Sequence, residues 1–394
     1  MKRDSALRGR RQLLVSAFAA PLLTQTAGLA QSARPLSFPG KRSMLVHNDF
    51  PEDLESPADS LQSFLTPLDR FFVRQHLPRP RVSASEWRLA VAGAVSKPLT
   101  LSLDELRKLP QHKLPATLEC AGNGRGYFRP RIPGLQWTKG AVGTAEWAGP
   151  RIADLLQRAG VDAKATYIDF DGADVGVAQT PDFVRSIPTR KGMHPDTILA
   201  LTMNGEPLPE IHGFPARLIV PGWDGASWVK WVTRITAALE PNKGFYFATG
   251  YRYPKFPVAP GAAARPEDME VIEAMPVKSI FTKPAAGTPA EPARFSKGRV
   301  SLSGLAWSGE NKIVRVEVSA DGGASWLDAA LGRENFRYAW RLWQHEWTPP
   351  GPGYYTLCVR ATDSAGRMQP IEAPWNPSGY LWNSIERIAA LVEA

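Results

Sequence analysis

Proline and glycine recur along the whole chain, and this pattern constrains the fold more than any other feature of the sequence. The 394 residues include 36 prolines and 33 glycines, which are spread out and do not form repeats. Both residue types interrupt helices and favour turns, so we expect short strands with irregular connections and no helix bundle. A chain of this length, with 43% hydrophobic and 22% charged residues, can form two globular domains.

The first thirty residues have the pattern of an export signal. Arg10 and Arg11 lead into a weakly apolar run that ends at Leu23, and small residues offer a cleavage point near Ala30. The run is too short to cross a bilayer as a helix, so we expect no membrane span. We predict a twin-arginine signal over residues 1–30 and a periplasmic mature protein; an ordinary basic N-terminus is the alternative. Twin-arginine export carries folded proteins, which favours a cofactor enzyme.

The net charge of the mature chain is modest. Without residues 1–30, which carry five basic side chains and one acidic side chain, the formal charge falls from +9 to +5. The sequence has no run of interleaved basic and aromatic residues, so we expect no nucleic-acid partner. The remaining excess suits a small anionic substrate or an acidic protein partner.

The two cysteines lie in different surroundings. Cys358 lies in an apolar run typical of a buried strand, where a thiol is inert. Cys120 follows an extended apolar segment and begins a loop of small residues that leads to Arg125. A nearby cation favours the thiolate, which binds soft metals or acts as a nucleophile. From these residues alone, Cys120 can be a buried structural residue, a metal ligand or a nucleophile.

Motifs for several common enzyme classes are missing from the sequence. It contains no Gly-x-Ser-x-Gly, no His-Glu-x-x-His, no phosphate-binding loop, no Cys-x-x-Cys and no Cys-x-x-Cys-His for covalent haem. A cysteine nucleophile would also need a histidine base held by a third group, and no signature for that arrangement is present. Hydrolase, zinc-enzyme and cytochrome interpretations are therefore unsupported.

Several segments of the chain resemble, in the expected order, the sulfite oxidase family of molybdopterin enzymes. These segments are residues 71–76, 120–125, 134–147, 203–209, 212–217, 221–222 and 229–231. Together they cover roughly residues 70–255, and no single one carries the resemblance. The resemblance implies that Cys120 is the protein ligand to the metal of a molybdenum-molybdopterin cofactor.

The resemblance also implies an anion pocket. Arg74 and Arg125 would hold the substrate, since a guanidinium stays protonated and offers a planar fork of donors. Arg341 resembles a third pocket arginine contributed by the second domain. Trp137 would form a wall of the pocket. Tyr251 would place its hydroxyl near the metal, although Tyr253 or a simple packing role is the alternative.

A second group of residues would hold the pterin. Histidine, arginine, serine and lysine side chains are suited to hydrogen bonding with a phosphate, and an aspartate can accept from pterin nitrogens. The positions that match the family are His76, Asp174, His212, Arg217, Ser227 and Lys230, together with Cys120.

The character of the chain changes after residue 255. Residues 255–266 form a Pro/Ala-rich connector, and Val314, Val316 and Val318 then alternate with polar residues before a turn. This period of two predicts a β-sandwich. We therefore predict an α+β protein with a mixed, sulfite-oxidase-type molybdopterin-binding catalytic domain over residues 31–260 and a β-sandwich over residues 267–394. In the resembling family this second domain is immunoglobulin-like and mediates dimerisation, so we expect a homodimer.

The resemblance implies a sulfite dehydrogenase, which oxidises sulfite to sulfate by oxygen-atom transfer. Because the chain lacks a covalent haem motif, electrons would leave singly to an external c-type cytochrome. Another molybdenum-dependent oxygen-atom transfer is the alternative, namely oxidation of sulfane sulfur or reduction of a sulfoxide or nitrate. An exported β-sandwich adhesion module and a cysteine hydrolase are rivals from other classes, but an adhesion module leaves the Cys120 loop without a purpose.

Overall fold

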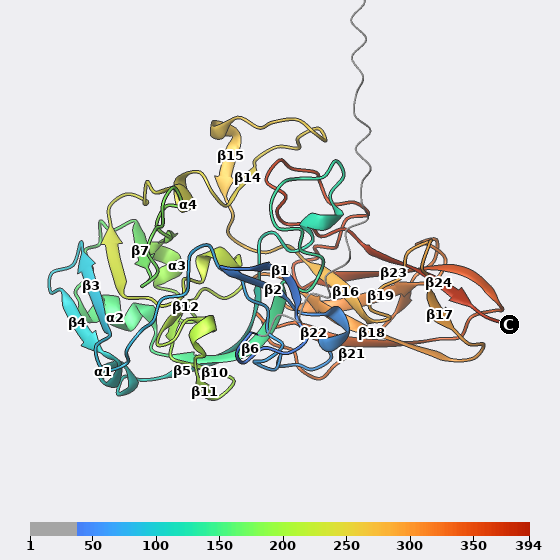
Figure 1. Cartoon of the computed structure of the whole chain (residues 1–394), viewed down its shortest axis with the longest axis horizontal. Helices are drawn as coiled ribbons and strands as arrows, with labels where there is room; N and C mark the ends of the chain where they lie inside the picture. The colour runs from blue at the N-terminus through green and yellow to red at the C-terminus, as the bar shows by residue number, and fades with distance from the viewer. Residues whose placement is uncertain (1–37) are drawn as a thin grey trace, which may run out of the picture. The chain divides into compact units, whose positions relative to one another are not determined.

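A strand-rich architecture with few, short helices occupies residues 38–394, the part of the chain that the computed structural model describes (Figure 1). The signal predicted for residues 1–30 lies outside the described residues. The longest α-helix among residues 38–394 is α2 (Ile152–Arg158), with seven residues. In this part of the chain we find no helix with the length and apolarity that a membrane span requires. The predicted α+β class and the exclusion of a helix bundle are confirmed.

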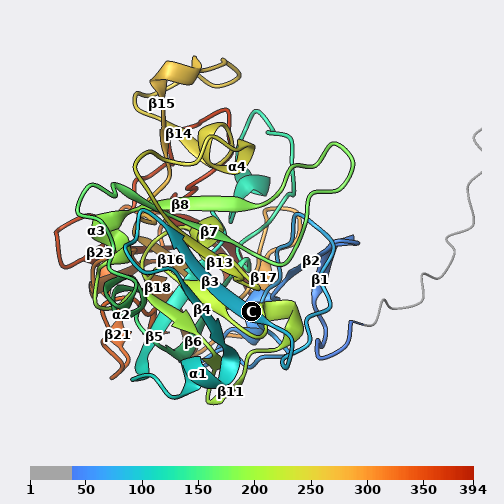
Figure 2. The same cartoon turned by 90° about the vertical axis from the view of Figure 1, so that its left-hand side faces the viewer.

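A five-stranded mixed sheet forms one side of the N-terminal part (Figure 2). Its strands in spatial order are β4 (Leu99–Ser102), β3 (Arg88–Gly93), β13 (Arg234–Ala238), β7 (Tyr167–Asp171) and β8 (Val184–Pro188). Strand β13 runs parallel to β3 and antiparallel to β7. Along β3, Leu89 and Val91 are buried while Arg88 is exposed, which is the alternation that a sheet with one covered face requires.

Helix α1 (Leu103–Arg107) shows how local sequence sets an element boundary. Ser102 accepts a hydrogen bond from the Glu105 backbone N–H, and the Glu105 carboxylate accepts from the Ser102 N–H at 2.8 Å. This reciprocal capping fixes the start of the helix, and Leu103 and Leu106 enter the core. The remaining α-helices are α3 (Thr189–Gly192) and α4 (Phe245–Ala248).

A second sheet carries the segment that leads to Cys120. Its order is β11 (Glu206–Pro207), β10 (Thr202–Met203), β6 (Val142–Gly149) and β5 (His112–Glu119). Strands β5 and β6 pair antiparallel, from His112 opposite Gly149 to Glu119 opposite Val142. Because β5 ends at Glu119, Cys120 is the first residue of the following loop. Two-stranded pairs complete this part: β1 (Leu45–Asp49) with β2 (Glu52–Glu55), and β9 (Ile198–Ala200) with β12 (Arg217–Ile219).

Residues 278–392 form two mostly antiparallel sheets, which we call the C-terminal sandwich. One sheet has the order β16 (Lys278–Lys283), β18 (Val300–Trp307), β22 (Arg341–Trp347) and β21 (Ala330–Leu331). The other has the order β17 (Ala293–Phe295), β24 (Glu386–Val392), β23 (Gly353–Asp363), β19 (Ile313–Ser319) and β20 (Leu327–Asp328). Their facing side chains, among them Phe281, Trp343 and Leu357, make a separate core. The predicted β-sandwich is confirmed.

The sandwich corrects one detail that was expected from the sequence and agrees with another. Val316 and Val318 on β19 are buried as expected, but Val314 is 52% exposed. The pairing of β19 with β23 shifts register between Ile313 and Arg315, and a bulge of this kind turns one side chain to the opposite face. Cys358 lies on β23 as a buried free thiol, in agreement with the prediction of an inert core residue.

The Pro/Ala-rich residues 255–266 connect two strands that pair with each other, β14 (Arg252–Pro254) and β15 (Met269–Val271). In Figure 1 this yellow segment extends away from the two sheets of the N-terminal part. Residues 255–266 are therefore the loop between two paired antiparallel strands as well as a connector. The boundaries predicted at residues 260 and 267 remain predictions.

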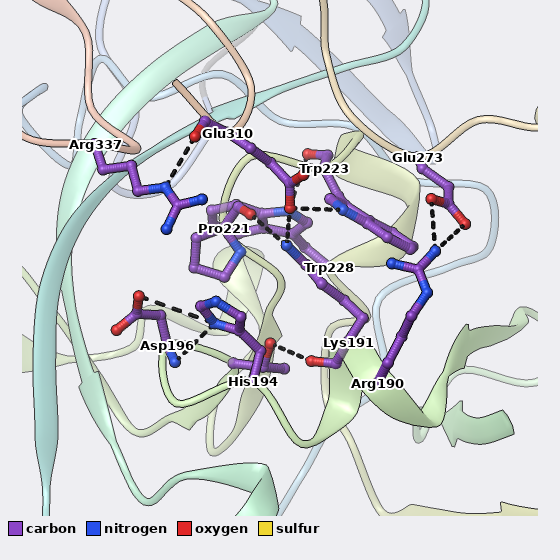
Figure 3. A network of polar contacts seen from close by, with 11 residues as sticks. Arg190, Lys191, His194, Asp196, Pro221, Trp223, Trp228, Glu273, Glu310 and Arg337 are labelled. Carbon is purple, nitrogen blue, oxygen red and sulfur yellow. Dashed lines mark hydrogen bonds and ion pairs between the residues drawn. The ribbon is translucent and has the colours of Figure 1, made fainter. Parts of the chain in front are cut away.

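A polar network connects the C-terminal sandwich to helix α3 and to residues 221–223 (Figure 3). The buried Lys191 ammonium of α3 donates to the Pro221 carbonyl at 3.0 Å and to Glu310 Oε1 at 2.6 Å. Trp223 Nε1 donates to the same Glu310 oxygen at 3.3 Å, and Arg337 Nε donates to the Glu310 carbonyl at 2.9 Å. Residues 221–223 directly precede the buried turn of residues 225–227, so this network holds the approach to that turn.

Candidate active site

Two adjoining cavities meet at Cys120 and collect most of the residues predicted from the sequence. We call them the inner and the outer cavity. The predicted residues that line the inner cavity are Arg74, His76, Cys120, Asp174, His212, Arg217, Lys230 and Tyr251. Those that line the outer cavity are Arg74, His76, Cys120, Arg125, Trp137 and Tyr251. Cys120 therefore lies where the two cavities meet. Asp174, His212, Arg217 and Lys230 line only the inner cavity, and Arg125 and Trp137 line only the outer one, whereas Arg74 lines both.

The loop that begins at Cys120 is held firmly by its own backbone. The Cys120 N–H donates to the Ala141 carbonyl at 3.0 Å, and the Asn123 N–H donates to the Cys120 carbonyl at 2.8 Å. The Asn123 amide also bridges Glu119 Oε1 and the Ala141 N–H. Burial raises the pKa of the Cys120 thiol, while Arg74 opposes that shift. The thiol is thus protonated without a ligand and needs a metal or another strong partner to become a thiolate.

Arg74 is anchored at the edge of both cavities. Its guanidinium Nη1 donates to Asp53 Oδ1 at 3.0 Å and to the Gln75 carbonyl, and Asp53 also accepts from the Gln75 N–H. Asp53 is buried, so it fixes one side of the guanidinium. The donors not used by Asp53 and Gln75 remain for an anion in the cavity.

Tyr251 and His76 form a buried pair. The Tyr251 hydroxyl lies 2.7 Å from His76 Nε2. Burial lowers the pKa of His76 well below its usual value, and Arg74 adds to the shift, so the imidazole is neutral and Nε2 can accept the hydroxyl proton. Burial raises the pKa of Tyr251 well above its usual value, so the phenol keeps that proton. The alternative, Tyr253 on β14, lines neither cavity.

A cluster of cations without anionic partners surrounds the inner cavity. Arg217 Nη1 donates to the His212 carbonyl at 3.1 Å, but Arg217 Nε and Lys230 Nζ are buried and have no hydrogen-bond partner in the described part of the chain. Burial lowers the pKa of Arg217 to about 9. Burial and the neighbouring Arg217 lower the pKa of Lys230 well below its usual value. Buried cations of this kind are costly unless an anion joins them, so the cluster fits a bound phosphate.

Of the two remaining predicted residues, Asp174 lines the inner cavity and Ser227 lines neither cavity. Ser227 is buried in the turn of residues 225–227, next to Ala226, which lines the inner cavity, and its hydroxyl has no hydrogen-bond partner among residues 38–394. Burial raises the pKa of the Asp174 carboxyl to about 6 while Lys230 opposes the shift. The Asp174 carboxyl can hold the polar ring edge of a cofactor, and the phosphate contact of Ser227 stays a prediction.

We expect inorganic phosphate to raise the Tm of ligand-free protein by about 2 °C, because a dianion compensates the unpaired cations. Binding should also take up protons, since an anion returns the lowered pKa of Lys230 toward its usual value. Thermal unfolding in phosphate against chloride of equal ionic strength, and calorimetry in two buffers, measure these effects. Lys230→Met should lose most of the Tm increase and most of the proton uptake. Lys243→Met, which replaces an exposed lysine, should keep both effects. Equal phosphate effects in both variants would contradict the assignment.

Arg125 and Trp137 belong to the outer cavity. Arg125 Nη1 donates to the Leu135 carbonyl at 3.1 Å. Trp137 is fully buried and packs against His47, with ring centroids 4.5 Å apart. Both residues therefore line the outer cavity, and neither lines the inner cavity with the cation cluster; their roles toward a substrate stay predictions.

The prediction for Arg341 is wrong, because this residue lines neither cavity. It lies on β22, and its Nε and Nη1 donate to the carbonyls of Gly332 at 3.1 Å and Ile313 at 3.2 Å within the sandwich. The C-terminal part does reach the outer cavity, but through Ser378 and Tyr380 in the loop after β23. A strand residue tied to its own sheet cannot extend to the site, whereas this loop docks on it.

Two basic residues near the site, the half-buried Lys41 and the buried Arg185, were not predicted from the sequence. Lys41 Nζ lies 2.6 Å from His212 Nε2, and it also donates to the carbonyls of Leu68 and Phe71. Arg185 on β8 is fully buried, with Nη2 3.8 Å from Asp224 Oδ2 and Cζ 5.2 Å from the centre of the Tyr251 ring. Neither Lys41 nor Arg185 lies in a recognisable motif, so no local pattern in the sequence indicated them.

Asp224, which contacts Arg185, also caps the turn of residues 225–227. Its carboxylate accepts from the N–H groups of Ala226 at 2.7 Å and Ser227 at 3.1 Å, which caps the turn of residues 225–227. Burial raises the pKa of Asp224 to about 6, and Arg185 opposes that shift. The pair therefore connects the wall behind Tyr251 with the turn that lines the inner cavity.

Comparisons with known proteins match the two parts of the fold separately. The model of the oxidoreductase molybdopterin binding domain matches residues 76–246, and that of the Mo-co oxidoreductase dimerisation domain matches residues 269–392. The mitochondrial sulfite oxidase of Rattus norvegicus is 35% identical over 379 residues, covering 90% of this chain and 66% of its own length. The sulfite oxidase of Arabidopsis thaliana is 30% identical and covers 89% of this chain and 94% of its own length.

A solved structure extends the comparison to the whole fold. The crystal structure of the sulfane dehydrogenase SoxCD from Paracoccus pantotrophus aligns with a TM-score of 0.76 and 29% sequence identity. The alignment covers 98% of this chain and 100% of that one. The chain spans about two thirds of the rat relative, so that protein has further residues beyond the matched part.

Proposed function

This chain belongs to the sulfite oxidase family of molybdopterin oxidoreductases, and from that membership we propose that it oxidises sulfite to sulfate and passes the electrons to a separate acceptor. It is an oxidoreductase, and its cofactor is molybdenum-molybdopterin. The observation that carries the proposal is the position of Cys120 between the unpaired cations of the inner cavity and the arginines of the outer cavity.

The residues present fit this cofactor. The buried Lys230 Nζ, Arg217 Nε and Ser227 Oγ have no hydrogen-bond partner among residues 38–394, and each can bind a phosphate or a pterin edge. Cys120 would supply the thiolate ligand. When bound, the molybdenum supplies oxygen-atom transfer and accepts two electrons from the substrate.

The protein's own groups would bind and orient the substrate. Arg74 and Arg125 both line the outer cavity and supply fixed positive charge for a small oxyanion. The Tyr251 hydroxyl, held 2.7 Å from the neutral His76 ring, can turn its proton between that ring and the anion. Trp137, Tyr246 and Tyr380 give the outer cavity an aromatic wall. Donors that the fold holds in place before the substrate arrives need no reorganisation when charge develops.

Oxidation of sulfane sulfur is the second candidate. It is favoured by the alignment with the sulfane dehydrogenase SoxCD, which covers both chains almost completely. The outer cavity is also lined by Phe245, Tyr246 and Tyr380, so its walls are largely aromatic beyond the two arginines. Such walls can accept an apolar sulfur carrier more readily than a charged pocket would. Reduction of a sulfoxide or nitrate stays a further alternative.

The partners and the location belong to the same proposal. We propose a homodimer formed through the part that matches the Mo-co oxidoreductase dimerisation domain, residues 269–392. We propose a c-type cytochrome as the electron acceptor. The Arg10-Arg11 pattern supports twin-arginine export of the folded enzyme to the periplasm, with a cleavage site near Ala30.

The test is a substrate comparison with purified mature protein that contains about one molybdenum per chain. We expect sulfite-dependent reduction of cytochrome c, and much slower reaction with a protein-bound sulfane, methionine sulfoxide or nitrate. Faster oxidation of the sulfane would move the function to the second candidate. Absence of all four reactions in molybdenum-loaded protein would overturn the proposal, since the cofactor would then serve another substrate.

A further inference from the structure

A loop of the C-terminal part, residues 376–382, docks directly on the loop that carries Cys120. The Leu381 N–H donates to the Ala121 carbonyl at 2.9 Å. A Cβ at Gly124 would lie 2.8 Å from a ring carbon of Trp382, so only glycine allows this close packing. The Asn376 side chain accepts from the Tyr380 N–H at 3.2 Å and donates to the Tyr380 carbonyl at 3.0 Å. The backbone at Tyr380 is therefore fixed from both sides.

Within this loop, Tyr380 lies between two residues of the proposed substrate site. Its ring stacks on the Tyr251 ring with centroids 5.5 Å apart and planes 12° apart. The Arg125 guanidinium carbon lies 5.0 Å from the centre of the Tyr380 ring. Tyr380 also lines the outer cavity with Arg74 and Cys120. One aromatic ring thus contacts both the anion-binding arginine and the tyrosine near Cys120.

Arg125 has few other contacts that could fix its direction. Its guanidinium donates one hydrogen bond, to the Leu135 carbonyl, and its Nε is buried without a partner. Three glycines surround it: a Cβ at Gly122, Gly134 or Gly379 would lie 2.8 to 3.1 Å from Arg125 nitrogens. These glycines leave room for the Arg125 side chain, but they have no side chains with which its guanidinium could form a hydrogen bond. The face of the Tyr380 ring is then the main surface that can orient the guanidinium.

Tyr380 can act in this way only as a neutral ring. Burial raises the pKa of its phenol, and Arg125 opposes that shift. A protonated phenol keeps the ring face available to a cation without adding a negative charge that would compete with the substrate for Arg125.

We propose that Tyr380 is a positioning residue, whose ring orients Arg125 toward the substrate anion and supports Tyr251, so that the C-terminal part of the fold sets the anion affinity of the site. The inference rests on the proposed function in one respect, that the outer cavity binds a small oxyanion. It assigns no chemical step to Tyr380, because its contacts are with Arg125 and Tyr251.

The experiment compares two substitutions of the holoenzyme, Tyr380→Phe and Tyr380→Leu. Phenylalanine keeps the ring face, whereas leucine removes it. We expect Tyr380→Leu to raise the KM for sulfite and the calorimetric Kd of sulfate about tenfold, with a smaller change in kcat. Tyr380→Phe should stay within about twofold of wild type in both quantities. Tyr253→Leu is the matched control. Tyr253 packs against the same aromatic cluster but does not line the outer cavity with Arg125, so its replacement should leave the KM and the sulfate Kd unchanged.

A double-mutant cycle guards against a general packing effect. If Tyr380 acts through Arg125, Tyr380→Leu should change the sulfate Kd little in an Arg125→Gln background. An unchanged sulfate Kd in Tyr380→Leu, or equal losses in Phe and Leu variants, would overturn the inference. An enzyme that binds sulfate but oxidises only a sulfane would defeat the proposed function while this comparison still tests Tyr380. Wild-type protein that binds no oxyanion would defeat both.

Discussion

Cys120→Ser is expected to lower molybdenum-dependent turnover by more than about a hundredfold. Removal of groups that only support a metal's ligands already costs about 10- to 100-fold, and Cys120 is the proposed protein ligand itself. A serine hydroxyl is a harder donor that stays protonated near neutral pH, so it replaces a soft thiolate poorly. Metal analysis and steady-state sulfite oxidation of the exported protein, on the same preparation, measure the effect.

Cys358→Ala is the matched control for this substitution. Cys358 is the other thiol of the chain and is buried on β23 in the C-terminal sandwich. Its replacement should reduce stability slightly through the lost packing and leave molybdenum content and KM unchanged. Full activity in Cys120→Ser, with a normal amount of molybdenum, would show that another group binds the metal.

Lys278→Met is expected to lower the free energy of unfolding by about 3–5 kcal/mol. Lys278 and Glu119 are each 1% exposed, and Nζ lies 2.5 Å from Glu119 Oε1. The same carboxylate accepts from Asn123 Nδ2 at 2.9 Å and from Trp307 Nε1 at 2.7 Å. Methionine fills a similar volume but leaves the Glu119 charge buried without a cation, and this uncompensated charge is the main cost. Equilibrium unfolding in guanidinium chloride measures the loss.

Two comparisons separate charge from packing. The double variant Lys278→Met with Glu119→Gln removes the unpaired charge and should recover most of the loss. Arg294→Met breaks the ion pair with Glu393, whose side chains are largely exposed, and should cost less than about 1 kcal/mol. A loss in Lys278→Met no greater than that in Arg294→Met would contradict a buried, uncompensated carboxylate.

The Lys278 pair also explains why the two parts of the fold depend on each other. Glu119 is the last residue of β5 and directly precedes Cys120, whereas Lys278 begins β16 of the sandwich. The position of the proposed metal ligand is therefore tied to a strand more than 150 residues away, through contacts that are fully buried. Loss of this pair should loosen the Cys120 loop as well as the fold.

Local sequence was sufficient for much of the site. Cys120 and Arg125 lie in one short loop, and Arg74 and His76 lie two residues apart, so their common location follows from neighbourhood along the chain. Glycine at positions 122 and 124 was recognisable because a loop that packs closely around a side chain needs small residues. The strand period around Val316 and Val318 likewise predicted the sandwich, because alternation reports which face is buried.

The tertiary structure alone decided how distant segments meet at that site. Arg341 has favourable local context, yet β22 directs it to carbonyls of its own sandwich, while the loop with Ser378 and Tyr380 reaches the cavity. Lys41 and Arg185 likewise become part of the site through contacts that no motif signals. The physical reason is that side-chain periodicity is a property of one segment, whereas docking depends on complementary surfaces far apart in sequence. The sequence by itself determined the proposed metal ligand, the family resemblance and the sandwich; packing decided which residues surround the proposed substrate arginines.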